Sequence, residues 1–106
     1  MYLNMQSITD PDNFRDNIRQ RLTVFIDSTK TVENIEKGIY NYTIREATKK
    51  NLVKKWYNPY FVIIYKDRLR TVFINLQNTD LIERIKSKKI KPHQVAFMSH
   101  QEISPS

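Results

Sequence analysis

Residues 65–76, YKDRLRTVFINL, decide the fold class because their apolar side chains recur at helical spacing. With the residues just before them they form a series spaced by four, four, three and four, which is one face of an α-helix. The series consists of Phe61, Tyr65, Leu69, Val72 and Leu76. The segment FVIIY (61–65) alone would also fit a buried strand, but the pattern continues well past strand length. We therefore predict a helix that begins at Asn58-Pro59, where Asn caps the helix and Pro suits its first position.

The same signals predict helices on both sides of this one. Asp10-Pro11 opens a first helix, which we expect to end near Ser28–Thr29 because short polar residues compete there for backbone hydrogen bonds. A second helix follows from about Thr31. Its Gly38 either allows another element to pack closely or is a tolerated weakness of about 1 kcal/mol. The buried face of the first helix is expected to hold Phe14, Ile18, Leu22 and Phe25.

Shorter elements are predicted after the long helices. A fourth helix runs from about Thr79 and ends in KSKK, a short helix runs from Pro92 to Met98, and Ser99 and Glu102 have the spacing of a capping box. A single glycine and scattered prolines agree with helices joined by short links. The expected fold is all-α, a three-helix bundle with short additional C-terminal helices. Residues 1–11 are an N-terminal extension, 12–104 the bundle, and 105–106 the start of a linker.

Composition narrows the class of protein. A chain of 106 residues is one domain by length. It has no cysteine, and two histidines do not suffice for a structural zinc site, so we expect no cofactor and no metal. No apolar run approaches the ~20 residues of a membrane span, and the N-terminus does not resemble a signal peptide. We expect a monomeric intracellular protein with no membrane contact.

The charge of the chain is concentrated in one region. The net charge is +7, yet residues 45–91 alone carry thirteen Lys or Arg and four Asp or Glu, a net of +9. A block of that sign attracts polyanions or an acidic protein surface. Outside the central helix, the additional basic surface is expected to comprise Lys49, Lys50, Lys54, Lys55, Lys86, Lys88 and Lys89.

No set of residues has the pattern of a catalytic site. One glycine cannot make a phosphate loop, and no nucleophile motif or closely placed carboxylate pair is present. His93 follows Pro92 at a helix start and fits a surface or capping residue better than a base, and His100 lies in the capping-box turn. We therefore do not expect an enzyme.

The basic residues of the central helix divide between two flanks of its apolar face. At 100° per residue, Lys66 and Arg70 point the same way, whereas Arg68 lies on the opposite flank. Arg68 is either an outward contact or a structural residue paired with Asp67, Glu36 or a carbonyl group. A weak contact with nucleic acid is a further expectation. The aromatic residues available for it are Trp56 and Tyr57, which could equally close the end of the bundle.

The order of these segments resembles the central domain of the transcript-cleavage factor TFIIS and of related transcription proteins. The resemblance runs through residues 15–22, NIEKGIY (34–40), YKDRLRTVFINL (65–76) and LIERIKSKKIKPHQVAFMSHQEI (81–103), and so covers about residues 12–104. The positions that match the family pattern are Ile35-Glu36, Tyr65, Lys66, Arg68, Arg70, Asn75-Leu76, Leu81, Ile90, Pro92, Met98-Ser99 and Glu102.

The resemblance implies a bundle that docks on a multisubunit DNA-dependent RNA polymerase through Lys66, Arg68 and Arg70. It implies an elongation factor that promotes transcript cleavage by backtracked polymerase, with zinc only in a separate C-terminal ribbon outside this chain. The alternative is a basic helical module that binds nucleic acid. Richness in Ile, Asn and Lys would suit an AT-rich genome, such as that of a large DNA virus. The expected location is the nucleus if the protein is cellular, or a cytoplasmic replication site if it is viral.

Overall fold

The computed structural model describes residues 6–103, and within them every regular element is helical. The long helices are α1 (Pro11–Leu22), α2 (Thr29–Lys49) and α3 (Pro59–Asn75). The short ones are α4 (Thr79–Lys86), the 3₁₀ helix η1 (Pro92–Phe97) and α5 (His100–Ile103). The predicted all-α bundle with short C-terminal helices is thus confirmed. The expected linker at 105–106 lies outside the described residues, as does the end of the bundle at 104.

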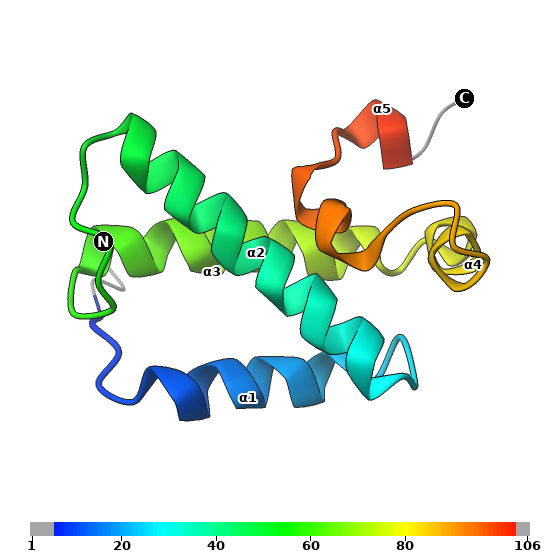
Figure 1. Ribbon diagram of the computed structural model, residues 1–106, viewed down its shortest axis with the longest axis horizontal. Coiled ribbons are helices and arrows are strands. Elements are labelled where there is room, and N and C mark those ends of the chain that lie inside the picture. The colour runs from blue at the N-terminus through cyan, green and yellow to red at the C-terminus, as the bar shows by residue number, and fades with distance from the viewer. Residues whose placement is uncertain (1–5, 104–106) are drawn as a thin grey trace.

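The long helices cross in two layers. Figure 1 shows α2 running diagonally across α3, with α1 along one side and α4, η1 and α5 gathered toward one end. The apolar stripe of α3 lies in the middle of this arrangement, and its residues Phe61, Tyr65, Leu69, Val72 and Leu76 are all buried, as predicted. Four of these residues, Tyr65, Leu69, Val72 and Leu76, belong to the main core cluster. Its other members are Ile18, Leu22, Ile26, Val32, Ile35, Ile39, Leu81, Ile85, Val95, Ala96 and Ile103.

The helix starts follow the capping rules read from the sequence. The Asp10 carboxylate accepts from the Asn13 amide at 3.2 Å, and the Asn58 side chain accepts from the Tyr60 amide at 3.1 Å. Each cap satisfies one of the amides that a helix N-terminus leaves unpaired. These contacts fix the starts of α1 and α3 next to the prolines that follow.

The predicted end of the first helix is wrong. Helix α1 stops at Leu22 rather than near Ser28–Thr29, because the Thr23 hydroxyl bonds back to the Gln20 carbonyl at 2.5 Å and the chain turns. Ser28 instead caps α2, with its hydroxyl 3.2 Å from the Thr31 amide. Phe25 consequently lies in the connecting turn, where its ring packs 5.8 Å from the ring of Phe73.

Gly38 allows close packing between α2 and η1. A methyl group built on Gly38 would collide with the His93 carbonyl oxygen and would lie 2.9 Å from its carbonyl carbon. Of the two explanations left open by the sequence, close packing is therefore the correct one. The contact brings η1 onto α2 and buries Val95 and Ala96.

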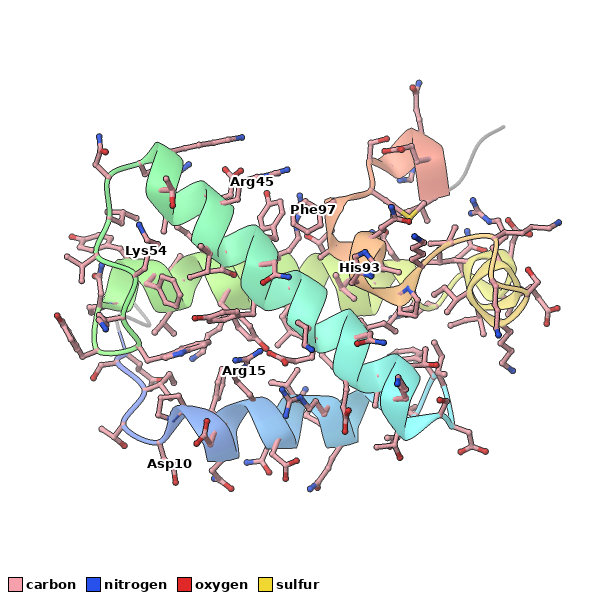
Figure 2. All side chains as sticks on the ribbon, in the orientation of Figure 1. Asp10, Arg15, Arg45, Lys54, His93 and Phe97 are labelled. Carbon is pink, nitrogen blue, oxygen red and sulfur yellow. The ribbon has the colours of Figure 1, made fainter. Side chains whose placement is uncertain are left out.

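A fully buried carboxylate joins the three long helices. Glu36 on α2 has no exposed surface and accepts from Arg15 at 2.7 and 2.9 Å, from Arg19 at 3.0 and 3.2 Å, and from the Tyr65 hydroxyl at 2.8 Å. Arg15 reaches from α1 toward the middle of the bundle (Figure 2). Burial raises the pKa of the Tyr65 hydroxyl, and the charge of Glu36 raises it further, so the hydroxyl stays a donor. A buried charge of this kind is tolerable because it is paired and hydrogen-bonded.

The C-terminal turns are held by backbone and side-chain hydrogen bonds. The predicted capping box is present: the Ser99 amide donates to Glu102 at 2.8 Å, and the Glu102 amide donates to the Ser99 hydroxyl at 3.2 Å. Hydrogen bonds from Ser99 lower the pKa of the Glu102 carboxyl. Arg84 of α4 donates to the carbonyl groups of Glu102 and Ile103, which ties α4 to α5.

Candidate functional site

The three cations predicted to form the binding site all lie on α3, but they have different surroundings. Lys66 and Arg68 are half-buried, whereas Arg70 is exposed. The buried stripe that includes Tyr65 and Leu69 packs the opposite side of α3 into the core. Helical spacing puts Lys66 and Arg70 on one flank of α3 and Arg68 on the other. Their contacts agree: Lys66 bonds to Gln6, Arg70 pairs with Asp67, and Arg68 stacks on Tyr42 of α2.

Lys66 lies on the flank next to the N-terminal segment. Its ammonium group donates to the side-chain oxygen of Gln6 at 3.3 Å. The segment is held nearby, because the Ile8 amide donates to the Trp56 carbonyl at 2.8 Å. A neutral partner leaves the charge of Lys66 unbalanced, so the group remains able to attract an acidic surface.

Arg70 is one turn further along the same flank. Its guanidinium lies 3.3 Å from the Asp67 carboxylate, and the two side chains are 72% and 65% exposed. An exposed pair of this kind contributes only about 0–1 kcal/mol. Arg70 can therefore leave Asp67 for a partner at little cost.

Arg68 lies on the other flank, against α2. Its guanidinium carbon is 3.9 Å from the centre of the Tyr42 ring, in the range of a cation–π contact. Its Nε is buried and has no hydrogen-bond partner among the described residues. Neither acidic candidate for a structural partner pairs with Arg68, because Asp67 pairs with Arg70 and Glu36 accepts from Arg15, Arg19 and Tyr65.

A further residue of α3, not predicted from the sequence, belongs to this surface. Ile74 is 60% exposed on α3. It follows Arg70 by four positions and Lys66 by eight, so the three share one helical face. We call Lys66, Arg70 and Ile74 the α3 face. The sequence already indicates Ile74 as a surface residue, because it is an isoleucine that lies outside the predicted buried stripe of α3.

The additional basic residues do not gather in one place. Lys49 and Lys50 lie at the end of α2 and contact Glu46 at 3.3 and 3.8 Å. The hydrogen bond from Lys49 lowers the pKa of the Glu46 carboxyl. Lys54 (Figure 2) and Lys55 lie in the loop between α2 and α3.

The remaining lysines of this set occupy the other end of the bundle. Lys86 ends α4, and Lys88 and Lys89 follow it in the connection to η1, far from the α2–α3 loop (Figure 1). The seven lysines therefore form two groups rather than one basic surface.

The aromatic residues of the α2–α3 loop are divided between core and surface. Trp56 packs against Phe14, Tyr40, Phe61 and Tyr65 with ring centres 5.1–6.0 Å apart, and so closes the end of the bundle. The side chain of Tyr57, in contrast, is 68% exposed, and that of Tyr60 on the first turn of α3 is 56% exposed.

The histidines do not form part of a cluster. His93 is the second residue of η1 and His100 the first residue of α5, and both are exposed. Within residues 6–103, no group of three or more His, Cys, Asp or Glu is arranged to hold a metal ion. No helix in the same part of the chain is long and apolar enough to cross a membrane.

Comparison with known families identifies the bundle. The family model described as Transcription factor S-II (TFIIS), central domain, matches residues 5–106, which is nearly the whole chain. The chain belongs to this family. No curated protein and no solved structure gives a significant match. The resemblance inferred from the order of the sequence segments is therefore confirmed.

Membership in the TFIIS central-domain family indicates what kind of function the chain has. The TFIIS central domain is the polymerase-binding part of a transcription elongation factor, is a binding domain rather than a catalytic one, and carries no cofactor. RNA polymerase is accordingly the kind of partner that the family predicts for this bundle.

Proposed function

We propose that residues 12–104 dock on a multisubunit DNA-dependent RNA polymerase through the α3 face. The observation that carries the proposal is the alignment of Lys66, Arg70 and Ile74 on the outward side of a helix whose opposite side is buried. The two cations steer the encounter with an acidic surface, and the side chain of Ile74, one turn beyond Arg70, gains from burial once the domain is docked.

Arg68 has a different part in this proposal. Its stacking on Tyr42 supports a role in holding α3 against α2, with the outer part of the guanidinium available to the polymerase from the second flank. All three basic residues inferred from the resemblance are therefore kept in the proposed binding region. Lys66 contacts only the neutral side chain of Gln6, and Arg70 is held by an exposed pair with Asp67 that a partner could replace.

The test compares two double variants with the same change in net charge. Lys66→Glu with Arg70→Glu is expected to abolish binding to the polymerase of the organism that encodes the chain, measured by biolayer interferometry. Lys30→Glu with Lys37→Glu, on exposed positions of α2, serves as the control and is expected to bind nearly as well as the unmodified chain. Both variants should keep the helical circular-dichroism spectrum. Equal loss in the two variants would mean that net charge, not the α3 face, governs binding.

We further propose that the domain works in a factor that promotes transcript cleavage by backtracked polymerase. Residues 1–106 contain no cysteine, so a zinc ribbon would have to be supplied outside them. The isolated chain should therefore compete with a complete cleavage factor for polymerase and slow cleavage in stalled elongation complexes. Stimulation of cleavage by the isolated chain would contradict the proposal that this domain only docks and that a separate zinc ribbon stimulates cleavage.

A second candidate function is weak binding to single-stranded nucleic acid at the α2–α3 loop. The observation that favours it is the exposure of Tyr57 and Tyr60 near Lys54 and Lys55. Exposed aromatic rings stack on bases, and lysines attract phosphates. Anisotropy titrations with short DNA and RNA should then show affinity that falls steeply with salt and with Tyr57→Ala. Absence of binding at low salt would exclude it.

The state and location of the protein complete the proposal. We propose a monomer, which analytical ultracentrifugation should report at 12.8 kDa. The chain would act in the nucleus of a cell or, if a virus with a cytoplasmic replication site encodes it, at that site. Imaging of a fluorescent fusion in the producing cell separates the two locations.

A further inference from the structure

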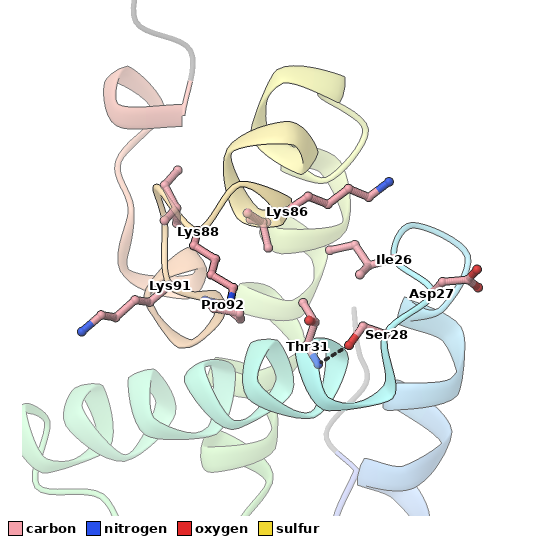
Figure 3. Close-up of a pocket in the computed structure, with 10 residues that line it drawn as sticks. Ile26, Asp27, Ser28, Thr31, Lys86, Lys88, Lys91 and Pro92 are labelled. Atoms are coloured by element: carbon pink, nitrogen blue, oxygen red, sulfur yellow. Dashed lines mark hydrogen bonds between the residues drawn. The ribbon is translucent and has the colours of Figure 1, made fainter.

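A pocket of about 560 Å³ opens at the end of the bundle away from the α2–α3 loop. It lies between the α1–α2 turn, the end of α4 and the connection to η1 (Figure 3). Its apolar lining consists of Ile26, Ile85, Ile90 and Pro92. The volume falls within the range of small-ligand sites, about 300–1,000 Å³. No residue of the α3 face lines it, so it is a separate surface.

Positive charge surrounds the apolar lining. Lys86 and Lys91 point away from each other on the two sides of the pocket, and Lys88 points toward Pro92 (Figure 3). Asp27 is the carboxylate among the described lining residues, and no ion pair within residues 6–103 joins it to these lysines. The three ammonium groups are therefore available to an anionic ligand that also fills the apolar space.

The backbone at Lys88 is unfavourable for a lysine. Lys88 has φ of 66°, in the left-handed region, where the chain turns after α4. Its amide bonds to the Ile85 carbonyl at 3.1 Å, and the next amide bonds to the Arg84 carbonyl at 2.9 Å. This is a Schellman C-cap, in which glycine or asparagine is the usual residue. Strained conformations persist at functional sites, and here the strained residue brings a charge to the pocket.

The chain has a second Schellman C-cap, after α2, and there the left-handed position holds the expected residue type. After α2, Asn51 has φ of 57°, and its amide bonds to the Thr48 carbonyl at 3.2 Å. The amide of Leu52 bonds to the Ala47 carbonyl at 2.9 Å, which completes the same motif. Asparagine tolerates the left-handed region better than lysine does. The two C-caps thus form a matched pair, one with the expected residue and one with a cation.

From the pocket, its lysines and the strained turn, we propose a docking site for an acidic peptide segment of another protein, with branched aliphatic side chains that enter the pocket. Aliphatic side chains match the isoleucine-rich lining, and flanking carboxylates match Lys86, Lys88 and Lys91. Nucleic acid fits less well, because the described lining has no aromatic ring on which a base could stack. A second copy of the chain fits poorly, since each copy carries a net charge of +7.

The first test uses a synthetic fluorescein-labelled peptide in which a Leu-Ile pair stands between runs of Asp and Glu. Binding is expected by anisotropy, with methyl chemical-shift changes in NMR at Ile26, Ile85 and Ile90. Shifts centred on Ile74 would place the peptide on the α3 face and overturn the proposal. Equal affinity for a peptide with Ser-Ser in place of Leu-Ile would also overturn it, because the apolar pocket would then contribute nothing.

Competing ligands are tested in the same assay. A short oligo(dT) and decanoate, a small anionic amphiphile, are titrated while the pocket methyl groups are observed. Neither is expected to displace the peptide at equal concentration. Preferential binding of either one to the pocket would replace the peptide as the occupant and refute the proposal.

Variants of the two C-caps separate binding from stability. Lys88→Gly removes the charge and relieves the strained turn, so it should weaken peptide binding about two- to fivefold. It should also raise the Tm by roughly 4 °C. Asn51→Gly, the matched control, should leave peptide affinity unchanged. Lys86→Glu with Lys91→Glu should weaken binding by about tenfold, since each reversal replaces an attraction by a repulsion. Unchanged affinity in both lysine variants would refute the role of the lysines.

Discussion

The substitution Gly38→Ala should have two opposite effects on stability, a gain in helix propensity and a collision with η1. In a helix interior, alanine is favoured over glycine by about 1 kcal/mol. Against this, the new methyl group would collide with the His93 carbonyl oxygen and lie 2.9 Å from the carbonyl carbon and 3.1 Å from the Cα. All three atoms are backbone, so no side-chain rotation can relieve the collision. The 3₁₀ helix η1 must move away from α2.

The cost of that movement exceeds the gain in helix propensity. Overpacking costs about 1–3 kcal/mol. Separation of η1 also exposes part of Val95, which is 1% exposed and whose full burial contributes about 1.5–3 kcal/mol. A combined loss of about 3 kcal/mol, less the gain of about 1 kcal/mol, gives a net destabilisation of about 2 kcal/mol.

Urea denaturation followed by circular dichroism measures this value, with Asn41→Ala as the control. Asn41 is exposed on the same helix, so its replacement tests propensity alone and should stabilise by a few tenths of a kcal/mol. A Gly38→Ala variant as stable as the unmodified protein would refute the close packing of η1 on α2.

Three other predictions concern hydrogen bonds and charge. Tyr65→Phe removes the 2.8 Å hydrogen bond to Glu36 and should lower the free energy of unfolding by about 2 kcal/mol in urea titrations; a change below about 0.5 kcal/mol would contradict it. Arg68→Ala should lower the free energy of unfolding by about 1 kcal/mol through loss of its ring contact, whereas Lys66→Ala should leave it nearly unchanged. The pKa of Glu102 is lowered below 4.5, so its stabilisation of α5 is complete above that pH and is lost as the pH falls through the lower folded-state pKa. The Ser99 amide shift in NMR should titrate with a midpoint below 4.5, and a midpoint at or above 4.5 would contradict it.

Local features of the fold could be predicted from the sequence because their causes are local. The stripe from Phe61 to Leu76 needed only the helical period, and the Asp10 and Asn58 caps needed only the residues just after them. The end of α1 is predicted too late. Thr23 looks like an ordinary helix residue in the sequence, yet its hydroxyl already bonds to the Gln20 carbonyl and ends the helix before Ser28 and Thr29 are reached.

Features that depend on distant partners could not be read in this way. The hydroxyl that bonds to Glu36 is 29 positions away, and no period connects the two. The role of Gly38 depends on the close approach of His93, which lies 55 positions away in the sequence. In the candidate site, helical spacing separated Arg68 from Lys66 and Arg70, but the contact with Tyr42 required the crossing of α2 and α3.

The buried carboxylate of Glu36 has a consequence for the alignment of the helices. Replacement of a buried ion pair by apolar residues is often neutral or stabilising, so the net stability it adds is small. Its donors, however, come from two different helices at fixed positions. A slide of α1 by one turn, about 5.4 Å, would withdraw both arginines and leave a buried charge with a single hydroxyl. Glu36 therefore favours the one alignment of α1, α2 and α3 in which Arg15, Arg19 and the Tyr65 hydroxyl all reach its carboxylate.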